Sequence, residues 1–244
     1  MDPVYTDYKK LDDQFEGPLI PALEAFNSLK EKYDAGERCI EDLWRMARFC
    51  YKKAEDLNTY KERKDILKQG LKYAEEAYKI DDHHFEAAKC VAMLSGQIRD
   101  YLNPWSRAWE HARYKKYLDR AISLKPEVYL LYLRGRWTYE ACSLTFWQRQ
   151  SYMLLLTTPP IGVINWAIED FREANEMNSL FFENQAYLGL AYFKKGQKGN
   201  ARGFLREGLN LTASNMEKEM LRNEVSIALR ECEEELNKSP HGTD

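Results

Sequence analysis

One pattern of side chains at positions i, i+4 and i+7 returns four times along this 244-residue chain and ends each time on a small residue. The small residues that end the four copies are Ala77, Ala121, Ala174 and Gly208, which lie 44, 53 and 34 residues apart. Positions i, i+4 and i+7 share one face of an α-helix, and a small residue there lets a second helix approach closely. The pattern therefore predicts repeated pairs of packed helices, with insertions wherever the spacing exceeds about 34 residues.

The copy nearest the C-terminus is the most complete. Its first helix contains Leu188-Gly189-x2-Tyr192, Gly196 follows at a turn, and the second helix carries the pattern that ends at Gly208. This arrangement matches a tetratricopeptide repeat, in which two antiparallel helices pack through small residues. We therefore predict an all-α protein, a tetratricopeptide-repeat-like right-handed helical solenoid with long insertions in the repeats and a C-terminal capping helix.

Composition and charge support this fold class and argue against several classes of protein. The chain has 28 Leu and 21 Ala against 5 Val and 10 Ile, and Leu and Ala favour helices whereas β-branched residues favour strands. The formal net charge of -3 argues against a nucleic-acid binder that depends on overall positive charge. Five scattered Cys and a polar, acidic N-terminus indicate a reducing compartment and no signal peptide. Because the sequence lacks the common catalytic and phosphate-loop motifs, we expect neither enzyme activity nor a cofactor.

The repeats define the expected organisation of the chain. We predict a flexible acidic tail over 1–16, a single tetratricopeptide-like domain over 17–237 and a disordered tail over 238–244. The expected repeats cover about 41–82, 84–126, 128–179 and 182–213, and a capping helix with an acidic outer face follows over 215–237. Helices are predicted over 18–34, 37–56, 61–79, 83–98, 106–124, 127–144, 163–177, 181–194, 198–211 and 215–237, with a further short one over 146–156.

Several segments of the sequence resemble a known family. They are Trp44-Arg-Met-Ala-Arg48, Tyr73-Ala-Glu-Glu-Ala77, Gly135-Arg-Trp-Thr-Tyr139, and Phe146-Trp-Gln-Arg149 followed by Thr158-Pro159-Pro160. Over roughly residues 40–235 the chain resembles the regulator of microtubule dynamics family. The resemblance implies a tetratricopeptide-like fold, association with microtubules and spindles, and a role in chromosome segregation. Some members of that family sit on mitochondrial or endoplasmic-reticulum membranes through a hydrophobic N-terminal segment and bind phospholipid, and no such segment is expected here.

The first helices of such repeats line a concave surface, and counting along each helix predicts which side chains face it. With Leu131 at position 4 of its repeat, positions 2, 5, 9 and 12 face the concave side. Aromatic rings supply contact area and Arg pairs with carboxylate or phosphate, so this surface suits an extended or helical peptide. The alternative is that the insertions and the N-terminal helix fill the groove. The predicted partner groove consists of Arg45, Phe85, Tyr129, Tyr132, Arg136, Tyr139 and Phe193, and Phe49 occupies a matching position in the first repeat.

Charge is distributed unevenly despite the near-neutral total. Residues 99–150 hold ten Lys and Arg against five Asp and Glu, residues 192–210 hold five against one, and residues 214–236 hold three against seven. Because microtubules expose acidic surfaces, basic segments on one face would steer binding through long-range attraction. The alternative is that these charges form ordinary solvated helix faces. The predicted basic contact surface consists of Arg113, Lys115, Lys116, Lys194, Lys195 and Lys198.

Two further segments have both a functional and a structural interpretation. Asp81-Asp82-His83-His84 contains metal-ligating residue types, but we predict a polar turn with an Asp or His at a helix N-cap, and no metal. The uncharged run over 150–168 contains Thr157-Thr158-Pro159-Pro160, and its double proline indicates two apolar pieces around a turn. This run is expected to form a buried connection, or else an apolar patch that meets lipid or a partner.

The sequence thus predicts a cytoplasmic, microtubule-associated interaction module at the cytoskeleton and spindle. Tubulin is expected as a partner, either directly or through an adaptor, together with other proteins that bind the repeat groove, and no nucleic acid is expected. The alternative function is a phospholipid-binding or lipid-transfer module at membrane contacts, which the uncharged run and the family resemblance both suggest.

Overall fold

The computed structural model describes residues 7–145, 162–211 and 216–238, and within these ranges it contains α-helices, one short 3-10 helix and no strand. The chain divides into two compact units, unit 1 over Met1–Lys125 and unit 2 over Pro126–Asp244, and each is described by itself. The sequence analysis treats residues 17–237 as one domain, and the division falls between its second and third predicted repeats. No helix in the described ranges is both long enough and apolar enough to cross a membrane.

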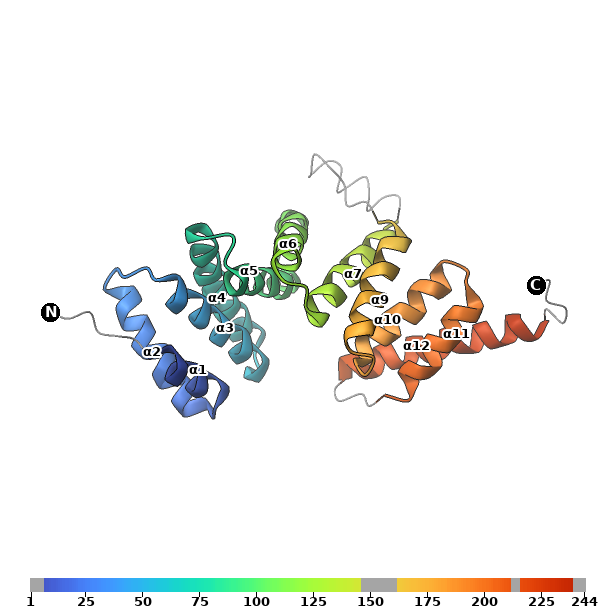
Figure 1. Ribbon diagram of the computed structural model, residues 1–244, viewed down its shortest axis with the longest axis horizontal. Helices are drawn as coiled ribbons and strands as arrows, with labels where there is room; N and C mark the ends of the chain where they lie inside the picture. The colour runs from blue at the N-terminus through green and yellow to red at the C-terminus, as the bar shows by residue number, and fades with distance from the viewer. Residues whose placement is uncertain (1–6, 146–161, 212–215, 239–244) are drawn as a thin grey trace. The chain divides into compact units, whose positions relative to one another are not determined.

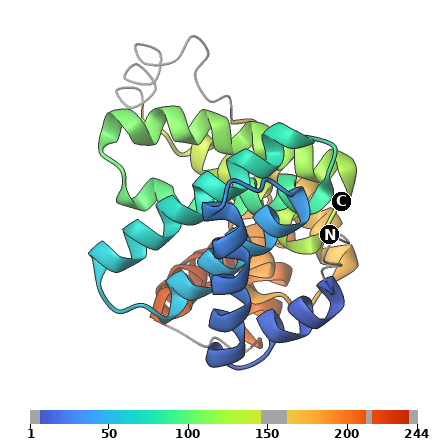
Figure 2. The same ribbon diagram turned by 90° about the vertical axis from the view of Figure 1, so that its left-hand side faces the viewer.

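Unit 1 is built from antiparallel helix pairs that follow one another along the chain (Figure 1). The predicted repeats over 41–82 and 84–126 each contain one pair, α3 with α4 and α5 with α6, and α5 also packs against α4. Figure 2 turns this unit toward the viewer and shows α1 and α2 (dark blue and blue) beside the repeats. Its helices are α1 (Tyr8–Glu16), α2 (Leu19–Asp34), α3 (Ile40–Asp56), α4 (Tyr60–Ile80), α5 (Phe85–Ile98), η1 (Arg99–Tyr101) and α6 (Pro104–Leu124).

Unit 2 repeats the same arrangement (Figure 1). The predicted repeats over 128–179 and 182–213 contain the pairs α7 with α9 and α10 with α11, and α12 packs on the last pair as the expected capping helix. The predicted helix over 146–156 lies outside the described residues, as does the uncharged run up to residue 161. The helices of this unit are α7 (Val128–Cys142), α9 (Ile164–Met177), α10 (Phe182–Lys194), α11 (Lys198–Leu209) and α12 (Met216–Lys238).

The small residues of the repeat pattern lie where the two helices of a pair meet. Ala77, Ala121 and Ala174 are completely buried, and Gly208 is buried as well. A Cβ atom placed on Gly189 would lie 2.7 Å from the Leu205 side chain, closer than two carbon atoms can approach, so α10 and α11 pack this tightly only with Gly at that position. The all-α, tetratricopeptide-like fold class is therefore confirmed, and close helix packing is its physical basis.

The turn between α10 and α11 shows why glycine follows the first helix of a repeat. Gly196 has φ of +83°, a left-handed conformation that glycine adopts without steric cost. The backbone N–H of Gln197 donates to the carbonyl of Tyr192 at 3.0 Å, and the N–H of Gly196 donates to the carbonyl of Phe193 at 2.9 Å. These bonds form a Schellman-type C-cap, which ends α10 and lets α11 fold back on it.

The N-terminal region differs from the prediction. Residues 8–16 form helix α1, where the sequence analysis expects a flexible acidic tail. Asp12 and Glu16 of this segment pair with basic residues of α3, and Phe15 is buried. Asp7 begins the helix by accepting a hydrogen bond from the Lys10 N–H at 3.1 Å. The remaining parts of the two predicted tails, 1–6 and 239–244, lie outside the described residues.

Candidate functional site

The predicted groove residues fall in both units, and the structure gives each a distinct environment. Arg45 in α3 is 6% exposed and is enclosed by α1 and by its own helix. Its Nε and Nη2 atoms donate to the two carboxylate oxygens of Asp12 at 2.7 and 2.8 Å, and Nη1 donates to Glu41 at 2.7 Å. The guanidinium also lies over the rings of Tyr8 and Trp44, 4.4 and 4.1 Å from their centroids. Arg45 is therefore already occupied within the chain, as the filled-groove alternative expects for the first repeat.

The charges around Arg45 stabilise one another. Burial alone would raise the pKa of Glu41, but hydrogen bonds from Arg45, Trp44 and His84 hold that pKa below its usual value. Burial likewise opposes the charge on Arg45, and the carboxylates of Asp12 and Glu41 outweigh it and raise the pKa of the guanidinium. The site is thus an ionised network at neutral pH, with carboxylates positioned to neutralise a buried cation.

Phe85, the second predicted groove residue of unit 1, is half-buried at the start of α5. The ammonium groups of Lys89 and Lys125 lie 5.6 and 5.0 Å from the centroid of its ring. This spacing is within the range of cation–π attraction. The ring therefore contacts cations of its own unit.

Unit 2 brings the other predicted aromatic residues together with one that the sequence analysis did not assign. Tyr132 and Tyr139 of α7 both contact Tyr187 of α10, with ring centroids 6.0 and 5.5 Å apart. The Arg136 guanidinium lies 5.6 Å from the centroid of the same Tyr187 ring. The signal for Tyr187 was its place next to the Leu188-Gly189 motif, on the turn of α10 that meets the preceding first helix. We call Tyr129, Tyr132, Arg136, Tyr139 and Tyr187 the aromatic–arginine cluster.

The members of this cluster differ in how much surface they offer. Tyr132 is 4% exposed, and burial raises the pKa of its hydroxyl above the usual value. The Arg136 side chain is 36% exposed, and its Nε donates to Glu140 at 2.9 Å. Tyr139 is half-buried, and burial followed by the nearby carboxylate of Glu224 raises its pKa to about 12. Tyr132 therefore serves packing, whereas Arg136 and Tyr139 keep surface that a partner can contact.

Phe193, at the end of α10, lies beneath a cation of α11. The Lys198 ammonium is 3.7 Å from the centroid of its ring, and it also pairs with Glu235 of the capping helix at 3.3 Å. At the other end of α10, Glu183 pairs with Lys218 of α12 at 2.9 Å. The capping helix thus contributes charges at both ends of α10.

The predicted basic residues at the end of α10 are accessible to solvent. Lys194 and Lys195 are both exposed at the C-terminus of that helix. Lys194 donates to the hydroxyl of Ser143 at 3.0 Å and lies 5.5 Å from the ring centroid of Tyr139. Among the residues that the structure describes, no carboxylate pairs with either lysine. Lys194 thus lies beside the aromatic–arginine cluster, and Lys195 is its neighbour along the chain.

The predicted basic residues of α6 are largely paired within unit 1. Arg113 pairs with Glu75 of α4 and, at 3.2 Å, with Glu110 of its own helix. Lys115 pairs with Asp119 one turn further on at 2.6 Å. Lys116 is exposed. Glu75 lies outside the segment 99–150 that was counted from sequence, so its pair with Arg113 lowers the positive potential of this segment further.

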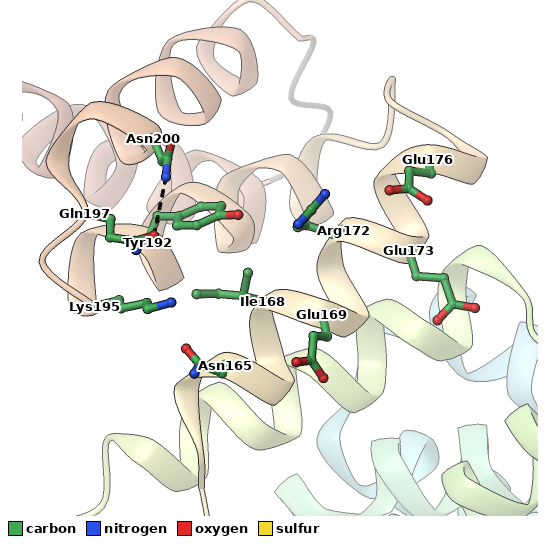
Figure 3. A pocket seen from close by; sticks show the side chains of 10 residues that line it. All are labelled: Asn165, Ile168, Glu169, Arg172, Glu173, Glu176, Tyr192, Lys195, Gln197 and Asn200. Atoms are coloured by element: carbon green, nitrogen blue, oxygen red, sulfur yellow. Dashed lines mark hydrogen bonds between the residues drawn. The ribbon is translucent and has the colours of Figure 1, made fainter. Parts of the chain in front are cut away.

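A shallow depression of about 520 Å³ lies between α9 and the α10–α11 turn (Figure 3). Its polar lining has both signs of charge, with Lys195 at the α10–α11 turn and Arg172 on α9 together with the glutamates of that helix. Gln197 and Asn200 are joined across its rim by a hydrogen bond of 3.3 Å. The mixed charge favours no simple anion or cation, so the depression adds to the surface around Lys195 and is not treated as a separate site.

The turn before α5 has the conformation that the sequence analysis predicts. His84 is the N-cap of α5 and accepts a hydrogen bond from the Ala87 N–H at 3.3 Å. Ligand atoms of Asp81, Asp82 and His83 lie within 4.8 Å of one another at the surface. However, the Arg120 guanidinium lies 3.0 Å from the Asp82 carboxylate and 2.7 Å from the His83 ring, and its positive charge disfavours a cation there. The N-cap interpretation is confirmed.

Comparison with known proteins now identifies the family. The family model described as regulator of microtubule dynamics protein 1-3 matches residues 7–233, nearly the whole chain. The chain belongs to the regulator of microtubule dynamics family. The match includes helix α1, the Arg45 network and the aromatic–arginine cluster, so both surfaces lie within the region that the family model covers.

Relatives within the regulator of microtubule dynamics family differ in length. Regulator of microtubule dynamics protein 1 of Caenorhabditis elegans is 30% identical over 211 residues, which cover 86% of this chain and 93% of the relative. Regulator of microtubule dynamics protein 3 of Xenopus laevis is 27% identical over 83% of this chain, and protein 1 of Pongo abelii is 28% identical over 82%. The chain spans only 44% and 63% of the length of those two relatives.

Solved structures similar to this family member are tetratricopeptide-like. A crystal structure of MamA superposes with a TM-score of 0.54 and 17% identity, covering 91% of this chain and 99% of that one. A thermophilic tetratricopeptide-repeat protein of Thermus thermophilus superposes with a TM-score of 0.53 and 14% identity, covering 92% and 100%. At these identities the likeness describes the fold alone.

Proposed function

We propose that this protein is a non-enzymatic, microtubule-associated interaction module that regulates microtubule dynamics, with roles at the spindle and in chromosome segregation. The names of the relatives in its family support the link to microtubules, and a tetratricopeptide-like fold supports binding of protein partners. The protein acts in the cytoplasm at the cytoskeleton, and its partner is tubulin or an adaptor bound to tubulin.

The observation that carries this proposal is the position of Lys194 and Lys195. Both cations are exposed, no carboxylate pairs with them in the described structure, and Tyr139 of the aromatic–arginine cluster lies next to Lys194. An acidic segment can pair with the lysines while its side chains pack on the rings, and long-range attraction speeds its approach. Lys116 of α6 is a further exposed cation.

The test is co-sedimentation of the full chain with microtubules across a salt series. Lys194→Glu with Lys195→Glu is expected to weaken binding at least tenfold and to flatten its dependence on salt. The matched control is Lys61→Glu with Lys68→Glu, which makes the same change in net charge at two exposed positions of α4. An equal loss of microtubule binding in both variants would show that only net charge matters. Unchanged binding in both would show that Lys194 and Lys195 do not contact the microtubule.

The phospholipid-binding alternative stays a prediction. It depended chiefly on the uncharged run over 150–168, of which only residues 162–168 belong to the described structure. Native mass spectrometry of the purified protein is the matching experiment, because a bound lipid would appear as an added mass.

A further inference from the structure

Helix α1 lies on the face of the first repeat that the sequence analysis assigns to partners. Tyr8 lies over the Arg45 guanidinium, and Asp12, one turn later, accepts two hydrogen bonds from the same group. The Tyr8 hydroxyl also lies 3.4 Å from the Cys39 sulfur at the start of α3. The first half of α1 is thus held through a carboxylate and an aromatic ring that share one buried arginine.

The second half of α1 continues this contact further along α3. The Phe15 ring lies 6.0 Å from the Phe49 ring, centroid to centroid, and is 8% exposed. Glu16 pairs with Arg48 and, at 2.6 Å, with Lys52. The contacts run in the same order along both helices and are made by side chains, while α1 packs closely against α2.

The spacing of these contacts defines a recognition pattern. On α1 they fall at i, i+4, i+7 and i+8, which is one face of a helix, in the order aromatic, carboxylate, aromatic, carboxylate. On α3 the partners Arg45, Phe49 and Lys52 fall at i, i+4 and i+7. An amphipathic helix laid on a repeat face is a common mode of peptide recognition, and α1 has the form of such a ligand.

The apolar contacts that attach α1 to this face are few, whereas Arg45 on the face is a nearly buried cation that needs carboxylate partners. Phe15 is the one fully buried side chain of α1, the half-buried Leu11 packs on the same core, and the helix also packs against α2. A nine-residue helix is marginal on its own. The pairs that Glu16 makes are between side chains about half exposed, and such pairs contribute little. Arg45, in contrast, is a nearly buried cation that needs carboxylate partners, of which α1 supplies one.

We propose that the face of α3 formed by Arg45, Arg48, Phe49 and Lys52 is a binding surface for an acidic, aromatic amphipathic helix of a partner protein, and that α1 is its occupant within the chain. The partner helix carries the spacing of α1 and binds by displacing it. This surface is separate from Lys194 and Lys195, so either proposal can fail while the other holds.

The test uses isotope-labelled full-length protein titrated with an unlabelled peptide of residues 7–17, followed by NMR shifts of residues 40–56. In Asp12→Ala/Phe15→Ala/Glu16→Ala the peptide is expected to bind at least ~10-fold more tightly than in the unaltered chain, because the competing α1 no longer occupies the face. A control peptide with Lys in place of Asp12 and Glu16 is expected not to bind. We call Asp12→Ala/Phe15→Ala/Glu16→Ala the released variant. Adding Arg45→Gln to it is expected to abolish binding of the peptide of residues 7–17.

A milder variant covers the case in which the triple variant fails to fold. Asp12→Asn/Glu16→Gln keeps Phe15 and the size of each side chain, and the peptide is expected to bind it with an affinity between those of the other two proteins. Circular dichroism checks that each variant is folded. Absence of peptide binding in every folded released variant, or equal binding by the charge-reversed peptide, would overturn the proposal.

Discussion

The two end helices of the molecule cover repeat surfaces by different chemistry. In unit 2, α12 places Val225, Ala228 and Cys232 in the hydrophobic core beside α10 and α11. In unit 1, α1 places the buried ring of Phe15 and the half-buried Leu11 against the core and packs against α2, and ion pairs join it to α3. The difference indicates that buried apolar side chains attach α12 to its unit, whereas α1 combines a smaller apolar contact with ion pairs to α3.

Ion pairs alone do not distinguish the two helices. Besides its apolar stripe, α12 carries Lys218 and Glu233, which pair with Glu183 and Arg206 at 2.9 and 2.5 Å. These pairs flank three buried side chains, Val225, Ala228 and Cys232, while the pairs of α1 flank Phe15 and the half-buried Leu11. The apolar centre, and not the number of charges, therefore determines how firmly an end helix is attached.

The largest expected effect comes from placing a carboxylate at the centre of each contact. Val225→Asp puts a charge into a fully buried position, and we expect it to destabilise unit 2 by more than about 3 kcal/mol. Phe15→Asp is expected to cost only about 1.5–3 kcal/mol, because α1 can leave the surface and expose the carboxylate to water. Urea unfolding, with hydrogen exchange to assign the loss to a unit, measures both.

The exposed position Ile227 is the matched control on the same helix. Ile227→Asp is expected to change stability by less than about 0.5 kcal/mol. If Phe15→Asp were as damaging as Val225→Asp, α1 would be as integral to its unit as α12, and the comparison would fail.

Acidification is expected to lower the stability of unit 1 more than that of unit 2, by a smaller free energy than Val225→Asp. Burial, with the Arg99 guanidinium 2.8 Å away, lowers the pKa of His111 in α6 to about 3. The unfolded chain binds this proton near pH 6.5 and the folded chain does not, so the stability of unit 1 falls as the pH drops below about 6.5. The loss reaches at most about 1.4 kcal/mol per pH unit, or about 2.7 kcal/mol at pH 4.5. The described part of unit 2 contains no histidine.

Urea unfolding at pH 6.5 and 4.5 measures this loss. His111→Gln keeps an acceptor for Arg99 but does not titrate, so it is expected to remove most of the pH dependence of unit 1 in this window, leaving the smaller part due to carboxylates with lowered pKa values, such as Glu16 and Glu41. An unchanged slope in that variant would assign the effect to other groups.

Asp12 tests the charged half of the α1 contact. Asp12→Asn weakens the two charge-assisted hydrogen bonds that Arg45 donates to Asp12. Arg45 still has Glu41 as a carboxylate partner, and the Asp12 side chain is 40% exposed. We therefore expect Asp12→Asn to destabilise the contact of α1 by about 1–2 kcal/mol. Amide hydrogen exchange should become faster in α1 and stay unchanged in α12. Asp13→Asn, at the exposed neighbouring position, is the control, and an equal effect there would show that only the charge of the helix matters.

Most helices could be predicted from the sequence because their small and apolar residues determine the packing. The ten predicted helices that lie within the described residues end within three residues of their observed ends, from α2 to α12. Helix α1 was missed because its nine residues include five charged ones, and their stabilising partners lie more than thirty residues away on α3. Local pattern cannot show a partner that only the fold brings close.

The candidate site was predictable only in part, because a helix's own sequence does not show what packs on it. Counting positions along α7 placed Tyr129, Tyr132, Arg136 and Tyr139 on one helix, but it could not show that Tyr187 of α10 joins them. Position counting also gave Arg45 as open to a partner, and the structure encloses it. Both differences arise because exposure depends on what packs on a helix face, which the helix's own sequence does not contain.

The smallest effect is expected at Glu16, and it tests whether the outer end of the α1 contact is electrostatic. Glu16 is 52% exposed, and a hydrogen bond from Lys52 holds its pKa below the usual value, so its contribution is present above the usual carboxyl range and is lost as the pH falls. Glu16→Gln is expected to cost about 0.2–1 kcal/mol at low salt and nothing measurable in about 1 M NaCl, where the Debye length is about 3 Å. Glu24→Gln, at an exposed position of α2, is the control and should have no effect at either salt concentration. A Glu16→Gln cost that persists in high salt would mean that packing holds this end of α1, and α1 would then resemble α12 more closely than its ion pairs suggest.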